Sequence, residues 1–332
     1  MNNLETYFSW PITGHEAIIK YLQNCLLNNK LNQAFLFWGP RHTGKSTVAR
    51  YFSQAINCEN LKKSPAPCQK CQNCRQFKKK LFADFYEINL TEAKQDIVIE
   101  QIKELQSQLK LKSLLLNYKI AVINDADKLN NVSANALLKT LEEPFSKTII
   151  ILIAEDINKI LPTIISRCQV VKFNYLKERE VYDYLQKENW KRNEINFVVK
   201  LIHGQIGLAL NDDFDEYLKK YDRYLTNFFK LVNLTEHQKI KKNEELLEKQ
   251  ESAETKEMVN AWMGLIRDCF LLKIDSQDKV INQKYLTELD LLQEKFSLEK
   301  IIRLLKVISK IPQQLRLNLN LKIIFENFIL NL

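Results

Sequence analysis

The chain has 332 residues, of which 45% are hydrophobic and 27% charged, a composition typical of folded globular proteins. A chain of this length is longer than a domain with one hydrophobic core usually is, so two or three domains are expected. No apolar run approaches the roughly 20 residues that span a bilayer, and the N-terminus lacks a basic and apolar leader, so we expect a cytoplasmic protein without membrane contact. The net charge of +9 suits a polyanionic partner, although lysines on solvated surfaces would give the same value.

The first patterned stretch predicts a helix over residues 15–30, and a buried strand follows at Phe35–Trp38. The next eight residues match the phosphate-loop pattern G-x-x-x-x-G-K-[ST] in full, and a helical pattern continues to about Asn57. In such a loop the backbone N–H groups face the phosphates, Lys45 reaches the β and γ oxygens, and Ser46 ligates Mg²⁺. The sequence therefore predicts binding of ATP or ADP with Mg²⁺, and leaves hydrolysis open. The predicted nucleotide-binding residues are Gly39, Pro40, Arg41, His42, Thr43, Gly44, Lys45, Ser46 and Thr47.

Four cysteines follow the loop helix, three of them at C-x-x-C-x-x-C spacing and one ten positions upstream. They are Cys58, Cys68, Cys71 and Cys74. Four thiolates with two-residue gaps suit a tetrahedral Zn²⁺ ion whose closed shell makes it structural rather than catalytic. An iron–sulfur cluster takes the same ligands and is the alternative, whereas disulfides are disfavoured in a reducing cytosol.

Short apolar strands then alternate with helices. Strands are predicted at 85–88, 118–123 and 149–153, with helices at about 97–110 and 132–141. This alternation favours a parallel sheet with helices on both faces. After Phe173 only helical patterns follow, and their late apolar stripes suit either a core or a subunit interface.

Several of these stretches together resemble bacterial clamp-loader subunits of DNA polymerase III, in the AAA+ superfamily. The resemblance covers roughly residues 10 to 210, through Gly14-His15-Glu16, the four-cysteine insert, the run Ser133–Pro144 and the run Leu161–Gln169. A looser similarity to the family's collar is carried chiefly by Asn318-Leu319-Asn320. The resemblance implies an AAA+ phosphate-loop domain at 1–174 with a zinc module at 58–74, a helical lid at 175–212, and a helical collar for oligomerisation at 213–332.

Two kinds of clamp-loader subunit share these features, the gamma/tau ATPase and the delta-prime subunit. Hydrolysis needs an acid that holds Mg²⁺ and a carboxylate that polarises the attacking water. The ATPases carry Asp-Glu where this chain has Asn124 and Asp125, a degenerate form in which Asp125 could still serve. Ala154 stands in the segment where active members carry a hydroxyl residue, and Leu208 stands where they carry an arginine. These departures predict poor or absent turnover, because one lost charge-stabilising group can cost 10² or more in rate.

The run Ser166-Arg167-Cys168 is intact, and the resemblance implies that Arg167 acts as an arginine finger in trans on a neighbouring subunit's γ-phosphate. The alternative for Arg167 is an ion pair with a nearby acid. The implied role is a delta-prime-like subunit that supports ATP-dependent loading of the sliding clamp. Its implied partners are a gamma/tau-type ATPase, a delta-type clamp opener and, through the complex, the clamp and primer-template DNA.

Two other functions compete with this interpretation. One is a divergent gamma/tau-type ATPase that uses Asp125 in place of Glu. The other is a zinc-dependent nucleic-acid-binding protein, suggested by the charge and the cysteines. We rank it last because no aromatic residue lies between Cys58 and Cys74 to stack on bases, and Phe77 is the only one close after them.

Overall fold

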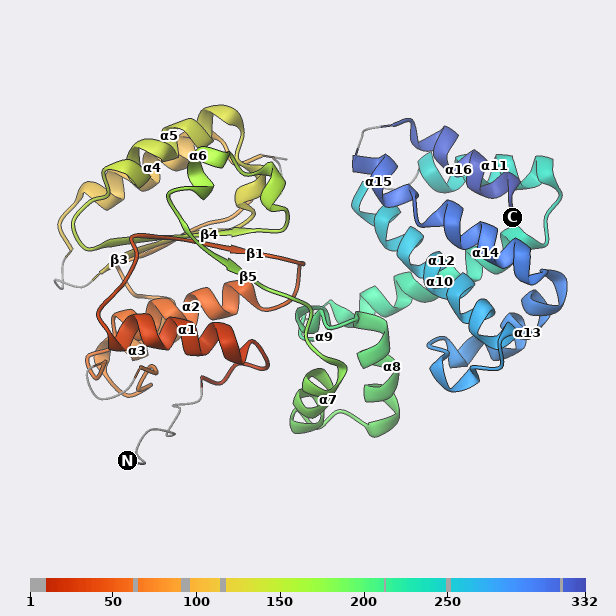
Figure 1. Ribbon diagram of the computed structural model, residues 1–332, viewed down its shortest axis with the longest axis horizontal. Coiled ribbons are helices and arrows are strands. Elements are labelled where there is room, and N and C mark those ends of the chain that lie inside the picture. Colours follow the sequence, from red (N-terminus) through yellow and green to blue (C-terminus); the bar gives the residue numbers. More distant parts are fainter. Residues whose placement is uncertain are drawn as a thin grey trace. The chain divides into compact units, whose positions relative to one another are not determined.

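The computed structural model describes residues 10–61, 65–90, 96–113, 118–211, 213–248, 252–316 and 319–332. Its contacts divide the chain into two compact units, Met1–Ala209 and Leu210–Leu332. Figure 1 shows the first as an α/β unit and the second as a helical unit. The predicted boundaries at 174 and 212 are a finer division and stay a prediction. Asn318 of the collar motif and residues 62–64 of the cysteine insert lie outside the described residues.

Five parallel strands form the sheet of the first unit, in the order β2-β3-β4-β1-β5 (Figure 1). All seven residues of β4 are buried, as expected for a strand covered on both faces. The register sets Trp38 of β1 beside Ala154 of β4, so the carboxyl ends of these strands meet at one edge of the sheet. The strands are β1 (Ala34–Trp38), β2 (Phe85–Ile88), β3 (Lys119–Ile123), β4 (Thr148–Ala154) and β5 (Gln169–Lys172).

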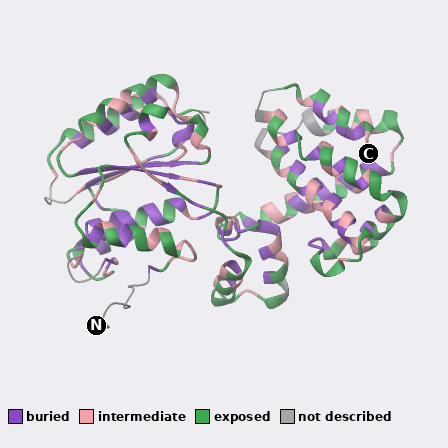
Figure 2. Ribbon diagram, viewed as in Figure 1, coloured by how far each residue is buried: buried purple, intermediate pink, exposed green. Residues whose placement is uncertain are grey.

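Helices cover both faces of this sheet, and Figure 2 shows the strands buried between them. On one face Phe52 of α2 packs into a core layer with Phe35 of β1. On the other face Leu105 of α4 and Leu137 of α5 pack with Leu152 of β4. The helices of this unit are α1 (Glu16–Leu27), α2 (Lys45–Ile56), α3 (Gln72–Lys78), α4 (Ile99–Lys110), α5 (Asn131–Glu142), α6 (Pro162–Ile165), α7 (Glu178–Lys187), α8 (Arg192–Ile202) and α9 (Ile206–Ala209), with 3₁₀ turns at Ala126–Lys128 and Ile157–Lys159.

The helices after Phe173 include a segment that lies directly on the phosphate loop. The Gly207 N–H donates to the His42 carbonyl oxygen at 2.7 Å. A Cβ atom on Gly207 would lie 3.0 Å from that same oxygen, tighter than ordinary van der Waals contact. Glycine at this position therefore permits the close approach of the two backbones.

The regular elements described in the second unit are all helices, as the sequence predicts. Trp262 is the centre of its core, with ring centroids 5.7 Å from Phe228, 6.1 Å from Phe325 and 5.8 Å from Phe328. The Trp262 indole N–H is satisfied by the Tyr224 carbonyl at 2.9 Å. The helices are α10 (Phe214–Val232), α11 (Glu236–Glu248), α12 (Ser252–Lys273), α13 (Leu286–Lys295), α14 (Leu298–Ile308), α15 (Ile311–Arg316) and α16 (Leu321–Leu330), with 3₁₀ turns at Gln277–Lys279 and Gln283–Tyr285.

The predicted alternation of four apolar strands with helices is confirmed, and so is the parallel arrangement. Strand β5 is not among the predicted strands. Among the described residues, no helix is both long enough and apolar enough to cross a membrane.

Candidate functional site

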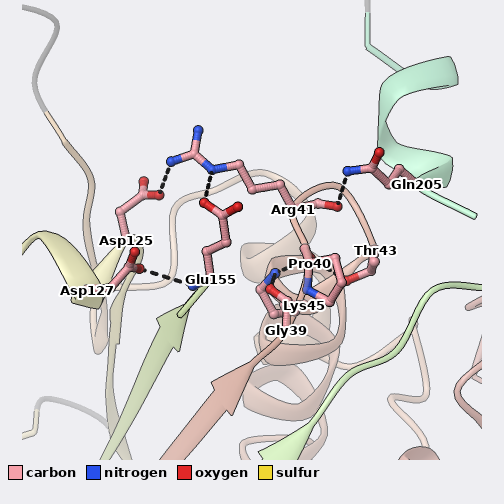
Figure 3. A network of polar contacts seen from close by, with 9 residues as sticks. All are labelled: Gly39, Pro40, Arg41, Thr43, Lys45, Asp125, Asp127, Glu155 and Gln205. Atoms are coloured by element: carbon pink, nitrogen blue, oxygen red, sulfur yellow. Dashed lines mark hydrogen bonds and ion pairs between the residues drawn. The ribbon is translucent and has the colours of Figure 1, made fainter. Parts of the chain in front are cut away.

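The predicted phosphate loop lies between β1 and α2, at the carboxyl edge of the sheet (Figure 3). Two of its residues show why the pattern requires glycine. Gly39 has φ +143°, and a Cβ there would lie 2.2 Å from the Phe173 carbonyl oxygen; Gly44, the N-cap of α2, has φ +93°. Because Gly44 starts α2, the free N–H groups of the first helical turn face the space beside the loop. That arrangement is suited to phosphate.

Lys45 is the buried cation of the loop. Its amine donates to the carbonyl oxygen of Gly39 at 2.7 Å and also to that of Pro40 (Figure 3). Burial lowers the pKa of Lys45 to about 8, against the opposing effect of the nearby Glu155 and Asp127 carboxylates. The lysine is therefore placed to exchange carbonyl partners for phosphate oxygens.

Side chains from distant segments hold the loop backbone. The His15 Nε2–H donates to the Thr43 carbonyl at 2.7 Å, and burial lowers the pKa of this histidine. From the other side, the Gln205 amide donates to the Arg41 carbonyl at 3.2 Å (Figure 3). Leu208, one of the predicted departures, lies half-buried on α9. The contacts of His15 and Gln205 with the loop were not apparent in the sequence, since neither residue belongs to the loop motif.

Asn124 follows β3 and lies beside Ser46, so the structure brings together the two positions that would hold Mg²⁺. The Ser46 hydroxyl donates to Asn124 Oδ1 at 3.1 Å. The Asn124 amide nitrogen donates to Glu87 Oε1 at 2.9 Å and to Asn89 Oδ1 at 2.7 Å. These partners fix a neutral amide beside the Ser46 hydroxyl.

Asp125 is present at the expected strand end, but its carboxylate is engaged by the loop itself. The guanidinium of Arg41 lies 3.5 Å from Asp125 Oδ1 and donates to Glu155 Oε2 at 3.0 Å (Figure 3). The Glu155 N–H in turn donates to Asp127 Oδ1 at 3.0 Å. Sequence reasoning placed Arg41 and Asp125 in the site but missed Glu155 as the second partner of Arg41.

The four predicted metal-ligating cysteines form one cluster. The sulfur atoms of Cys58, Cys68, Cys71 and Cys74 all lie within 4.8 Å of one another. Sulfurs around a tetrahedral Zn²⁺ ion are about 3.8 Å apart, given Zn–S bonds of about 2.3 Å, and the Cys68 and Cys74 sulfurs are 4.0 Å apart. Backbone N–H groups also point at the sulfurs, including that of Cys71 at 3.3 Å from Cys68 Sγ. The donor set fits a metal ion bound by four thiolates.

The cysteine insert is fixed to the rest of the unit by polar and aromatic contacts. The Gln54 amide of α2 donates to the Cys74 carbonyl at 3.1 Å. Phe77 is buried and stacks on Phe82, with ring centroids 4.2 Å apart. Because Phe77 packs inward, it does not offer the exposed ring that base stacking requires.

The sequence of the chain is similar to those of known proteins. Residues 14–177 match the family model described as "DNA polymerase III, delta subunit". The chain is 36% identical to DNA polymerase III subunit tau of Bacillus subtilis over 53% of its length, and 26% identical to subunit delta' of the same organism over 95% of both chains. These matches support a relationship of the chain to the bacterial DNA polymerase III clamp-loader subunits.

The chain spans different fractions of the length of these clamp-loader relatives. It spans 31% of the length of the Bacillus tau subunit and 56% of a gamma subunit from Buchnera aphidicola subsp. Schizaphis graminum, to which it is 32% identical over 60% of its own length. A solved structure of a gamma subunit-related protein from Thermotoga maritima is 18% identical and covers 94% of this chain and 97% of that one, with a TM-score of 0.45.

Arg167, the predicted clamp-loader arginine finger, follows α6 and lies on the surface. Its guanidinium pairs with Glu142 Oε1 at 2.7 Å and donates to the Thr163 carbonyl at 2.9 Å. The ion pair that the sequence left as an alternative is therefore present in the chain. Exposed pairs of this kind contribute about 0–1 kcal/mol, so Glu142 holds the arginine only weakly.

Proposed function

We propose that the chain is a delta-prime-like subunit of the DNA polymerase III clamp loader, which binds ATP or ADP but turns it over poorly or not at all. The observation that carries this proposal is the hydrogen bond from Ser46 to Asn124. It supports binding without turnover, because the loop that holds phosphates is complete while the acid that would hold Mg²⁺ is an amide.

The remaining catalytic positions support the same conclusion. Asp125 is paired with Arg41 and has a shorter side chain than the glutamate of the ATPases. Glu155, a carboxylate, follows Ala154 in the segment where a hydroxyl residue would contact the γ-phosphate. Losing one group that stabilises transition-state charge costs about 10²–10³ in rate, so several such losses in one site favour a negligible turnover.

The subunit acts in this proposal by supporting its neighbours. Arg167 leaves Glu142 and contacts the γ-phosphate held by an adjacent gamma/tau-type ATPase, where an arginine finger is worth about 10³–10⁵ in rate. The helical second unit serves as the collar that joins it to that ATPase and to a delta-type clamp opener. The assembled complex then loads the sliding clamp onto primer-template DNA in the cytoplasm. The four cysteines hold a structural Zn²⁺ ion.

Two observations favour a second candidate, a divergent gamma/tau-type ATPase. The whole phosphate loop and the Asp125 carboxylate are present, and the chain is 36% identical to a tau subunit over 176 residues. This candidate predicts ATP hydrolysis by the purified chain alone, abolished by Lys45→Ala.

An ATPase assay tests the proposal and separates the two candidates. The chain is measured alone and then mixed with a gamma-type subunit, a delta-type subunit, the clamp and primed DNA. We expect negligible turnover alone, and a mixed activity that Arg167→Ala lowers by about 10³.

The matched control is Arg179→Ala, since Arg179 is an exposed arginine whose ion pair to Asp183 spans one helical turn. It should leave the mixed activity unchanged. Turnover by the chain alone that depends on Lys45 would establish the ATPase candidate. A mixed activity that Arg167→Ala does not alter would remove the trans role.

A further inference from the structure

The phosphate loop forms ion pairs with two carboxylates on the side where β3 and β4 end. Arg41 projects from the loop and its guanidinium lies between two carboxylates from different strand ends, Asp125 at 3.5 Å and Glu155 at 3.0 Å (Figure 3). About half of each side chain is exposed, at 51%, 40% and 47% respectively. All three side chains are therefore able to change partners without disturbing the core.

The positive and negative charges around Arg41 and Lys45 do not balance. Asp125, Asp127 and Glu155 contribute three carboxylates, and all three act on the Lys45 amine, which has Arg41 as its cationic neighbour. Asp127 is buried and its Oδ1 accepts the Glu155 N–H, so this acid is fixed in place. Three acids against two cations leave an excess negative charge before any phosphate has entered.

The location of these acids matters because the phosphates of a nucleotide lie along the loop in order. The α2 N-terminus and Lys45 hold the β-phosphate. The γ-phosphate lies towards the strand ends, where phosphate-loop enzymes place the residues that hold Mg²⁺ and orient the attacking water. In this chain that region contains Asp125 and Glu155, which repel a third phosphate, and Arg41, which attracts one but is already paired.

We propose that the Asp125–Arg41–Glu155 network makes this site selective for nucleoside diphosphates over triphosphates. A diphosphate uses the loop and leaves the network intact. A triphosphate must draw Arg41 away from two carboxylates and then lie beside them. This inference rests on the proposed binding of nucleotide by the loop and adds its preferred ligand, with Arg41 and Glu155 as the residues that set the preference.

Titration calorimetry with ADP and with a non-hydrolysable ATP analogue, both with Mg²⁺, tests the proposal on the full chain. Glu155→Gln removes one repelling charge and leaves Arg41 with Asp125 as its remaining partner in the network, so affinity for the ATP analogue should rise on the order of tenfold while affinity for ADP changes less than about twofold. Arg41→Ala removes the cation and keeps both acids, so the ratio of the affinity for the ATP analogue to the affinity for ADP should fall. The double variant should lie between the two single variants, since the two substitutions shift the preference in opposite directions.

The matched control is Asp156→Asn, which makes the same change of charge one residue away. Asp156 accepts the Asn158 N–H at 3.1 Å and makes no described contact with Arg41, so the ratio of affinities should stay at the wild-type value. An equal response of Glu155→Gln and Asp156→Asn would overturn the network. So would a wild-type chain that binds the ATP analogue more tightly than ADP. Failure of the wild type to bind either nucleotide would overturn the proposed nucleotide role itself.

Discussion

At the residue scale, the site has the groups that bind phosphates but lacks some of the groups that hydrolysis requires. Holding phosphates needs N–H groups and a cation, which α2 and Lys45 supply. Hydrolysis also needs charge at the strand ends, where Asn124 is neutral and Asp125 is paired. The sequence predicted these residues as part of the site because each occupies a fixed position after the phosphate loop begins or after a strand ends. The Arg41–Glu155 contact could not be predicted, since 114 residues separate the partners and their meeting depends on the pairing of β1 with β4.

The lowered pKa of Lys45 gives the site a dependence on pH. With a pKa of about 8, the amine loses its charge as the pH rises from 7 to 9, so affinity for ADP should fall with rising pH. The charged fraction goes from about nine tenths to about one tenth over that range, which predicts a loss of up to about tenfold. Calorimetry at pH 7, 8 and 9 measures this. Lys45→Arg keeps its charge throughout and should give a flat profile; an equally flat wild-type profile would contradict the prediction.

At the element scale, the sequence pattern identified the three central strands and the edge strand β2, and missed the other edge strand, β5. β4 is a run of seven buried residues, whereas only one residue of β5 is fully buried. β5 is held by its pairing with β1, which sets Leu36 beside Val170. The equally short edge strand β2 contains Phe85, Tyr86 and Ile88, whereas β5 has only two valines between a glutamine and a lysine. Its apolar signal is therefore weak, and the strand depends on a neighbour that the local sequence does not reveal.

The cysteine cluster should behave as one structural metal site. We expect the purified chain to contain one zinc per molecule by elemental analysis, and Cys74→Ser to lose it, because Cys74 is buried and its thiolate would complete a closed four-thiolate shell. The thermal midpoint should fall by several degrees in that variant, as metal-binding energy contributes to folding.

Cys25→Ser is the control for this prediction, since Cys25 is a half-buried cysteine outside the cluster. It should retain the zinc and the wild-type midpoint. Iron in place of zinc, with the visible absorbance of an iron–sulfur cluster, would favour the alternative. A full zinc content after Cys74→Ser would refute the assignment of the ligands.

At the scale of the whole molecule, each unit has its own core, and the second unit also exposes apolar side chains. In α14, Ile301, Leu304 and Ile308 are buried while Ile302 is exposed. In α16, Ile323 is 65% exposed although Ile324 beside it is buried. Periodicity alone could not divide these stripes between a core and an interface, because both require the same residues. The exposed side chains of Ile302 and Ile323 suit the collar contacts of the proposed assembly.

Asp268 offers a way to test the second unit separately from the nucleotide site. Its carboxylate is fully buried, and Oδ2 accepts the N–H groups of Ile281 and Asn282 at 3.1 and 2.8 Å. Asp268→Ala leaves both backbone donors without a partner, at a cost of about 1–3 kcal/mol each. Denaturant unfolding followed by tryptophan fluorescence should show this loss, because one of the four tryptophans, Trp262, lies in the core of the same unit.

If the second unit is the collar, Asp268→Ala should also weaken association with the gamma-type subunit in gel filtration, while calorimetry finds ADP affinity unchanged. Asp268→Asn is the matched control, because its amide oxygen can still accept a backbone N–H and its loss of stability should be smaller. A destabilised Asp268→Ala chain that associates as well as the wild type would contradict the collar role. Parallel losses of ADP affinity and association would show instead that the two units depend on each other for folding.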